Sequence, residues 1–156
     1  MKKPAVVYLL CLLHLFLGLN GLVVGILLVL QPDGSLVGLS LNLLSHTAFS
    51  DFLVPGIMLL IFCGLLPLIT LTGLLLQPSW RVTERLNIYR DRHWAWAWSL
   101  YTGITVIAWI GFQMLLLQYY FWLQAVIIFI GLLILTGTLL PTVMNFYRQI
   151  DLRKRY

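Results

Sequence analysis

The chain has 156 residues, of which 61% are hydrophobic and 10% are charged, and it carries a formal net charge of +5. Most of its length is taken up by four apolar stretches of roughly 25 residues each, and about 20 apolar residues span the hydrocarbon core of a bilayer. The composition excludes a water-soluble domain, and the scattered basic residues do not form the basic surface of a nucleic-acid-binding protein. We expect a single all-α membrane domain over residues 1–156, a bundle of four transmembrane helices at about 4–30, 52–76, 93–117 and 121–146.

The first expected span begins directly after Lys2 and Lys3. Its apolar run continues for about 27 residues without a small-residue cleavage site, whereas a signal peptide has an apolar region of about 7–15 residues. We therefore expect a retained anchor. At helical spacing Gly18, Gly21 and Gly25 fall on one face, and small residues on one face allow two helices to approach closely. The pattern predicts a helix-packing face.

His14 lies on the same face as these glycines, near the middle of the expected span. A buried, hydrogen-bonded histidine is the simplest interpretation, and a cofactor ligand or a proton carrier are the alternatives. No second candidate ligand accompanies His14 in the sequence, so we expect no metal site and no cofactor. Cys11 and Cys63 also fall within expected spans and form no Cys-x-x-Cys motif, which indicates packing rather than redox chemistry.

The connection at 31–51 is unusually apolar for a loop. We expect it to lie on the outer membrane face or to fold back over the bundle, and we expect Ser50 or Asp51 to cap the second span. Ser45, His46, Ser50 and Asp51 include the residue types of a hydrolase triad, but no nucleophile-elbow motif surrounds either serine. A solvated loop with a helix cap explains these residues more simply.

The second expected span contains Pro67, which predicts a kink because proline removes one backbone hydrogen bond. The segment 79–92 is the one strongly polar part of the sequence, and we expect a short amphipathic helix there at the inner membrane surface. Amphipathic aromatic rings favour the two membrane interfaces. Aromatic clusters border the third and fourth spans accordingly, at Trp94, Trp96 and Trp98 on the inner side and at Tyr119, Tyr120, Phe121 and Trp122 on the outer side.

The basic residues are distributed asymmetrically between the connections. All ten precede the first span, separate the second from the third or follow the fourth, at Lys2, Lys3, Arg81, Arg85, Arg90, Arg92, Arg148, Arg153, Lys154 and Arg155. The connections at 31–51 and 118–120 contain none. Because loops that stay in the cytoplasm are rich in Lys and Arg, we expect both termini to be cytoplasmic.

Polar side chains form stripes on the third and fourth spans. Trp109 and Gln113 lie on one stripe and Gln124 on the other, and both stripes should face protein because polar groups in hydrocarbon need internal partners. Interhelical hydrogen bonds are one interpretation. The other is an outward-opening pocket for a small apolar ligand or a lipid headgroup, with Trp109, Gln113 and Gln124 in its walls and His46 and Asp51 in the loop above it.

No Asp, Glu, Lys or Arg lies in the middle of an expected span, and intramembrane ionisable residues are the usual mark of proton and ion pathways. The sequence also shows no activated nucleophile and no metal-ligand cluster. We therefore expect the protein to be no enzyme but a non-catalytic bundle that binds a lipid or a small apolar ligand. An accessory or scaffold subunit of a membrane complex and a small oligomeric transporter are the alternatives.

Several short motifs occur together between about residues 18 and 141. They are Pro32-Asp33-Gly34-Ser35, Gly38-Leu39, the stretch 49–56, His93-Trp94-Ala95, Trp109 with Gln113, and Trp122-Leu123-Gln124. As a set they resemble a widespread family of small, uncharacterised four-helix bacterial integral membrane proteins, although the segment 79–90 looks longer than the usual cytoplasmic loop of that family. The resemblance implies a four-helix fold in the bacterial inner membrane, and it implies no reaction and no catalytic residue.

Overall fold

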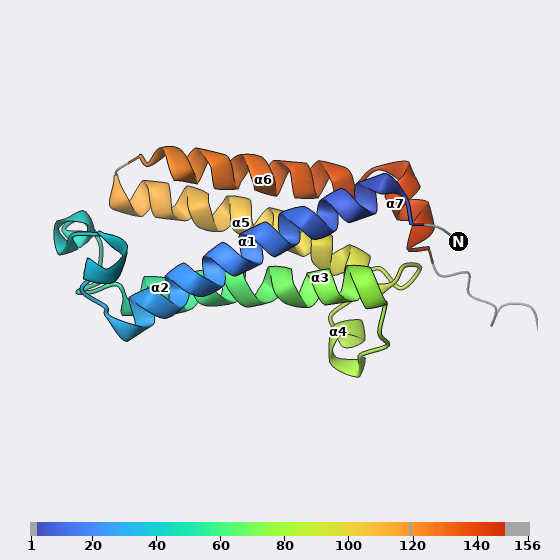
Figure 1. The fold of residues 1–156 in the computed structure, drawn as a ribbon, viewed down its shortest axis with the longest axis horizontal. Coiled ribbons are helices and arrows are strands. Elements are labelled where there is room, and N and C mark those ends of the chain that lie inside the picture. Colours follow the sequence, from blue (N-terminus) through green and yellow to red (C-terminus); the bar gives the residue numbers. More distant parts are fainter. Residues whose placement is uncertain (1–2, 119, 149–156) are drawn as a thin grey trace, which may run out of the picture.

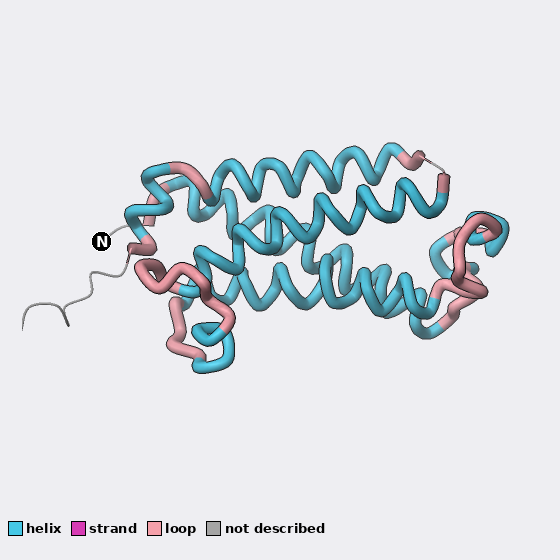
Figure 2. Tube along the Cα trace, turned by 180° about the vertical axis from the view of Figure 1, so that it is seen from behind, coloured by secondary structure: helices cyan, strands magenta, loops and turns pink. Residues whose placement is uncertain are grey.

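The structure is a computed structural model that describes residues 3–118 and 120–148. This part of the chain is helical and contains no β-strand. In chain order the elements are α1 (Ala5–Leu30), η1 (Ser35–Val37), η2 (Leu41–Leu44), α2 (Leu53–Leu59), η3 (Leu60–Leu65), α3 (Leu66–Leu76), α4 (Arg81–Arg85), α5 (Trp94–Leu117), α6 (Trp122–Thr138) and α7 (Pro141–Phe146). Figures 1 and 2 show the long helices lying side by side, with the connections gathered at the two ends of the molecule.

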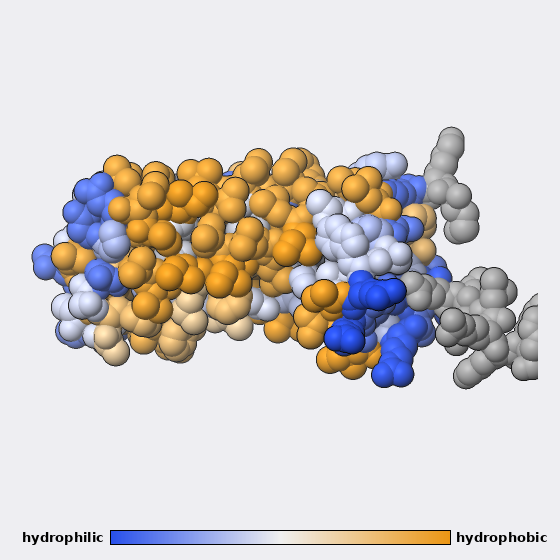
Figure 3. All heavy atoms as spheres, turned by 90° about the horizontal axis from the view of Figure 1, so that it is seen from below, coloured by the Kyte–Doolittle hydropathy of each residue, from blue (hydrophilic) through white to orange (hydrophobic). Residues whose placement is uncertain are grey.

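Three helical segments are long and apolar enough to cross a membrane. They are Ala5–Leu30, Leu53–Leu76 and Trp94–Leu117. Their outward side chains form the broad hydrophobic band of Figure 3, and hydrophilic atoms gather at both ends of it. The expectation of an all-helical membrane protein is thereby confirmed. We call the end that carries α4 and α7 the α4 end, and the end that carries η1 and η2 the loop end (Figure 1).

The fourth expected helix is not continuous. The sequence predicted one helix over 121–146, but α6 ends at Thr138 and α7 begins at Pro141. Leu140, which precedes the proline, has an extended backbone with φ −61° and ψ 135°. A proline ring disfavours the helical conformation in the residue before it, so the prediction of an uninterrupted helix was wrong at this position.

Pro67 has a related effect in the second span. The sequence predicted a kink there, and the structure places the π-helical segment η3 directly before Leu66, with Pro67 in the first turn of α3. Proline has no N–H for the carbonyl four residues earlier, and single π-helical turns interrupt α-helices at such positions. The irregularity of this span is therefore a local widening over 60–65.

α1 crosses the other helices diagonally, from α2 at the loop end to α7 at the α4 end (Figure 1). It meets η3 at the glycines of the packing face that the sequence predicted. A Cβ atom at Gly18 would lie 2.6 Å from Leu68 Cγ, and one at Gly25 would lie 2.8 Å from Leu60 Cα. At Gly21 a Cβ atom would overlap the backbone carbonyl group of Cys63. The two helices therefore touch backbone to backbone at this point.

Hydroxyl groups connect the interior faces of three helices. Thr70 Oγ1 on α3 lies 3.2 Å from Thr102 Oγ1 on α5, and Ser99 Oγ on α5 lies 2.7 Å from Thr138 Oγ1 on α6. The Trp96 indole also donates to the Thr138 carbonyl at 2.8 Å. All five of these residues are buried, so the bonds fix how α5 lies against its two neighbours.

The glycine contact gives a direct test of the packing. We expect Gly21→Ala to lower the thermal unfolding midpoint in detergent, because the added methyl group would overlap the Cys63 carbonyl, and overpacking typically costs about 1–3 kcal/mol. Gly111→Ala is the matched control, since a Cβ atom there meets nothing within 4 Å. Equal midpoints for the two variants would contradict the close contact.

Candidate functional site

An apolar groove lies between the α2–η3 segment and α5. Its volume is about 340 Å³, and it is lined by Met58, Phe62, Ile104, Thr105, Ala108, Trp109 and Phe112. The residues come from two adjacent spans, so the groove exists only because these helices pack together. Clefts between the helices of a bundle are common ligand sites.

The Trp109 indole is the main polar group in the wall of this groove. Its side chain is 6% exposed, and the ring lies edge-on to Phe62 with a centroid distance of 5.9 Å. Trp109 Nε1 has no hydrogen-bond partner among the residues that the structure describes. An unpartnered buried N–H costs free energy, and this nitrogen is itself buried, so the aromatic ring is what Trp109 contributes to the wall of the groove.

The structure separates the three residues that the sequence placed in one pocket. Trp109 lines the groove, whereas Gln113 and Gln124 do not. Gln124 Oε1 accepts a hydrogen bond from the Phe121 N–H at 3.0 Å, so its side chain caps the start of α6. Gln113 is half-buried one turn beyond Trp109. No Gln113–Gln124 hydrogen bond occurs within the ranges described.

The loop residues also lie away from the groove. His46 is exposed just beyond η2. The sequence predicted a cap at Ser50 or Asp51, but the N-cap residue of α2 is Phe52. Asp51 lies one residue before it, and its Oδ1 accepts from the Leu53 N–H at 3.0 Å. The loop does fold back on the bundle, because Leu44 and Phe52 are buried against Leu28 at the end of α1.

His14 is fully buried on α1. Its Nδ1 lies 2.7 Å from the Leu10 carbonyl, one turn earlier in the same helix, and its Nε2 has no partner among the described residues. The same part of the chain contains no group of three His, Cys, Asp or Glu side chains that could hold a metal ion.

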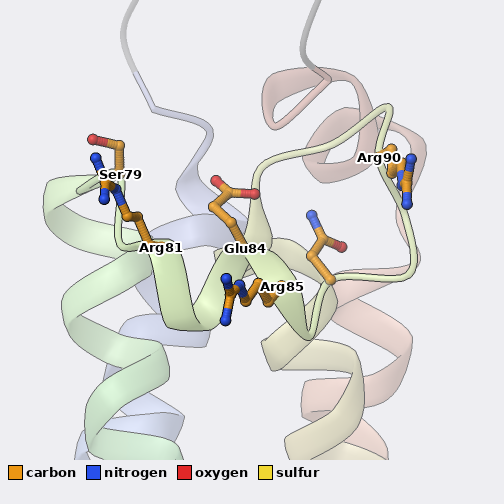
Figure 4. Close-up of a pocket in the computed structure, with 6 residues that line it drawn as sticks. Ser79, Arg81, Glu84, Arg85 and Arg90 are labelled. Atoms are coloured by element: carbon orange, nitrogen blue, oxygen red, sulfur yellow. The ribbon is translucent and has the colours of Figure 1, made fainter.

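A second hollow, of about 740 Å³, lies at the α4 end and is polar. Ser79, Arg81, Glu84, Arg85, Asn87 and Arg90 line it. Figure 4 shows these side chains on α4 and on the loop that returns to α5. The sequence predicted a short amphipathic helix here but no binding site.

The groove residues other than Trp109 were not recognised in the sequence. Met58, Phe62, Ile104, Ala108 and Phe112 are apolar or small residues within uniformly apolar spans. No periodicity distinguishes a lipid-facing position from a groove-facing one in such a span. Their common location depends on how α2 and η3 are rotated against α5.

Comparison with protein-family models, with curated proteins and with solved structures gave no match to this chain.

α5 begins at the α4 end with a histidine cap. His93 Nδ1 accepts a hydrogen bond from the Ala95 N–H at 3.2 Å. Burial lowers the pKa of His93 below its ordinary value, while nearby Glu84 and the carbonyl groups of Gln77 and Pro78 act in the opposite direction. The neutral ring is therefore the form that caps α5.

This cap predicts a pH dependence. Because the pKa of His93 is lower in the folded protein than in the unfolded chain, its contribution to stability is complete above about pH 6.5 and is lost as the pH falls through the folded-state value. We expect His93→Asn, which keeps a capping acceptor, to lose less stability than the unmodified protein between neutral and acidic pH. The measurement is the unfolding midpoint of both proteins across that range. Parallel pH profiles would show that His93 is not responsible.

Proposed function

We propose that the protein crosses the membrane four times with both termini in the cytoplasm, and that it resides in a bacterial inner membrane. α6 supports a fourth span because its 17 residues extend about 25 Å and lie beside α5 throughout (Figure 1). Trp122, Phe129 and Leu132 on α6 are exposed, as lipid-facing residues would be. The resemblance noted in the sequence supports the bacterial setting.

The positions of the described basic residues support the orientation. Lys3, Arg81, Arg90 and Arg148 all belong to segments at the α4 end (Figure 1). Lys3 Nζ donates to the carbonyl groups of Leu74 and Leu75, the last turn of α3. Lys2, Arg153, Lys154 and Arg155 lie outside the described residues, as does Tyr119 of the aromatic cluster at the other end. The positive-inside rule makes the α4 end cytoplasmic.

Reporter fusions test this topology. We expect a fluorescent protein fused after Tyr156 to fluoresce and an alkaline phosphatase inserted within 35–45 to be active, since the first reporter folds in the cytoplasm and the second in the periplasm. Phosphatase activity from a fusion at the C-terminus would contradict the four-span arrangement.

The groove supports a function in binding a lipid or a small apolar ligand, without catalysis. Trp109 lies eight residues from the end of α5 at Leu117, which places it about 12 Å along the helix from that end. At this depth a ligand meets acyl chains rather than headgroups. The observation that carries the proposal is the apolar groove itself, whose walls come from two adjacent spans.

The side chains that line the groove indicate which kind of ligand it would bind. Phe62 and Phe112 flank the Trp109 ring with centroid distances of 5.9 and 6.1 Å, and Thr105 is the other lining residue with a hydrogen-bonding side chain. An acyl chain or an apolar ring would make apolar contacts with these walls. No group in the groove is suited to activate a nucleophile.

Filling the groove tests the binding. We expect Ala108→Phe to abolish retention of an apolar ligand in native mass spectrometry of the gently extracted protein, and to abolish acyl-chain photocrosslinking to Met58 and Phe62. Ala125→Phe, at an exposed position of α6, should leave both signals unchanged. Ligand retention by Ala108→Phe would contradict the groove as the binding site.

The same native mass spectra also test the alternative functions. Retention of a protein subunit in place of any lipid would favour the accessory-subunit alternative, and an oligomer without ligand would favour the transporter.

A further inference from the structure

The polar segment between α3 and α5 is attached to the side of the bundle rather than extending away from its end. The Trp98 indole donates to the Thr83 carbonyl at 3.3 Å. Farther along, Tyr101 Oη donates to the Leu86 carbonyl at 3.4 Å and accepts from the Ile88 N–H at 3.4 Å. These bonds run from successive turns of α5 to successive parts of the segment, so they hold it along the helix.

The depth of this attachment places the segment at the membrane surface. Tyr101 is seven residues from the first residue of α5, Trp94, and seven residues of α-helix extend about 10 Å. The hydrogen bonds of Tyr101 therefore hold the backbone around Leu86 and Ile88 beside the first two turns of α5, near the end of the span. Figures 1 and 4 show α4 beside the ends of α3 and α5.

The side chains of the segment divide into two kinds. Four large apolar side chains are exposed, namely Trp80 (44%), Val82 (72%), Leu86 (58%) and Ile88 (80%). Such a cluster is unfavourable in water and marks an interaction with a membrane or a protein. The basic side chains Arg81, Arg85 and Arg90 are also exposed and line the polar hollow, with Glu84 between Arg81 and Arg90 (Figure 4).

None of the three arginines of the hollow forms an ion pair within the described part of the chain, where the ion pair that forms joins Arg92 to Asp91 at 3.7 Å. Glu84 lines the same hollow, but the segment 79–92 carries four arginines against Glu84 and Asp91, a net charge of +2. The Asn87 side chain is held in place, since its Nδ2 donates to the Arg92 carbonyl and its Oδ1 accepts from the Tyr89 N–H.

We propose that this hollow binds the phosphate of an anionic phospholipid from the cytoplasmic leaflet. Guanidinium groups match the geometry of phosphate oxygens and donate two hydrogen bonds at once. Ser79 and Glu84 are placed to bond the hydroxyl groups of a headgroup such as glycerol. Val82, Leu86 and Ile88 enter the acyl region beside the bound lipid, which a free phosphate ion would not require.

The proposal is tested with the full-length protein in phosphatidylcholine nanodiscs that contain a minor fraction of phosphatidylglycerol. Electron spin resonance of spin-labelled phosphatidylglycerol and spin-labelled phosphatidylcholine reports how strongly each is immobilised by the protein. We expect a preference for phosphatidylglycerol that falls on the order of fivefold for each arginine removed. Arg85→Gln should therefore weaken it, and the triple variant Arg81→Gln, Arg85→Gln, Arg90→Gln should eliminate it.

Arg148→Gln is the matched control, because this arginine is exposed at the same end and does not line the hollow. We expect it to keep the preference almost unchanged. Equal losses for Arg148→Gln and Arg85→Gln would overturn the site in favour of diffuse attraction to an anionic surface. Displacement of the labelled lipid by inorganic phosphate would contradict the proposal that the hollow binds a lipid and would favour a free phosphate ion. Ala108→Phe, which fills the apolar groove, should not affect the preference for phosphatidylglycerol. The proposal for the groove and the proposal for the hollow can therefore be contradicted independently.

Discussion

The contact of α1 with η3 at Gly21 is the constraint on which the arrangement of the other helices depends. There is no room for a side chain between Gly21 and the Cys63 carbonyl. In a membrane, where lipid provides no hydrophobic drive for helix association, close packing of this kind holds helices together. It also fixes the rotation of the π-helical segment, so that Cys63 and Gly64 face α1.

The rotation of η3 determines what the neighbouring side chains face. Phe62 immediately precedes Cys63, and its ring lies against Trp109 on α5. Met58, one turn earlier, lines the same groove. Thus one face of the second span, at Cys63 and Gly64, packs against the glycines of α1. An adjacent face carries the large side chains of Met58 and Phe62, which do not fill the space against α5. The groove is a consequence of this division, because Ala108 is too small to fill the space opposite Phe62.

The sequence was informative where a single local rule decides the outcome. Long apolar runs predicted the three long helical segments, and glycine spacing located the close approach of α1. The sequence was less informative where the outcome depends on helix rotation. Gln113 and Gln124 were assigned to one pocket because they lie on polar stripes of neighbouring spans, but Gln124 stands at the start of α6, where its side chain accepts a hydrogen bond from the Phe121 N–H. The chain also leaves the helix at Leu140, before Pro141, where the sequence had predicted one helix over 121–146.

The two hollows are related through one face of α5. At 100° per residue, Tyr101, Ile104, Ala108 and Phe112 fall within an arc of about 80°, and Ile104 and Phe112 are exposed. Tyr101 holds the polar segment at the α4 end, whereas Ile104, Ala108 and Phe112 line the apolar groove. From Tyr101 to Phe112 this face extends about 16 Å along the helix axis. The polar segment and the apolar groove therefore lie along the same side of α5, the first at the α4 end and the second farther along the helix. They remain two separate hollows, because the residues that line one do not line the other.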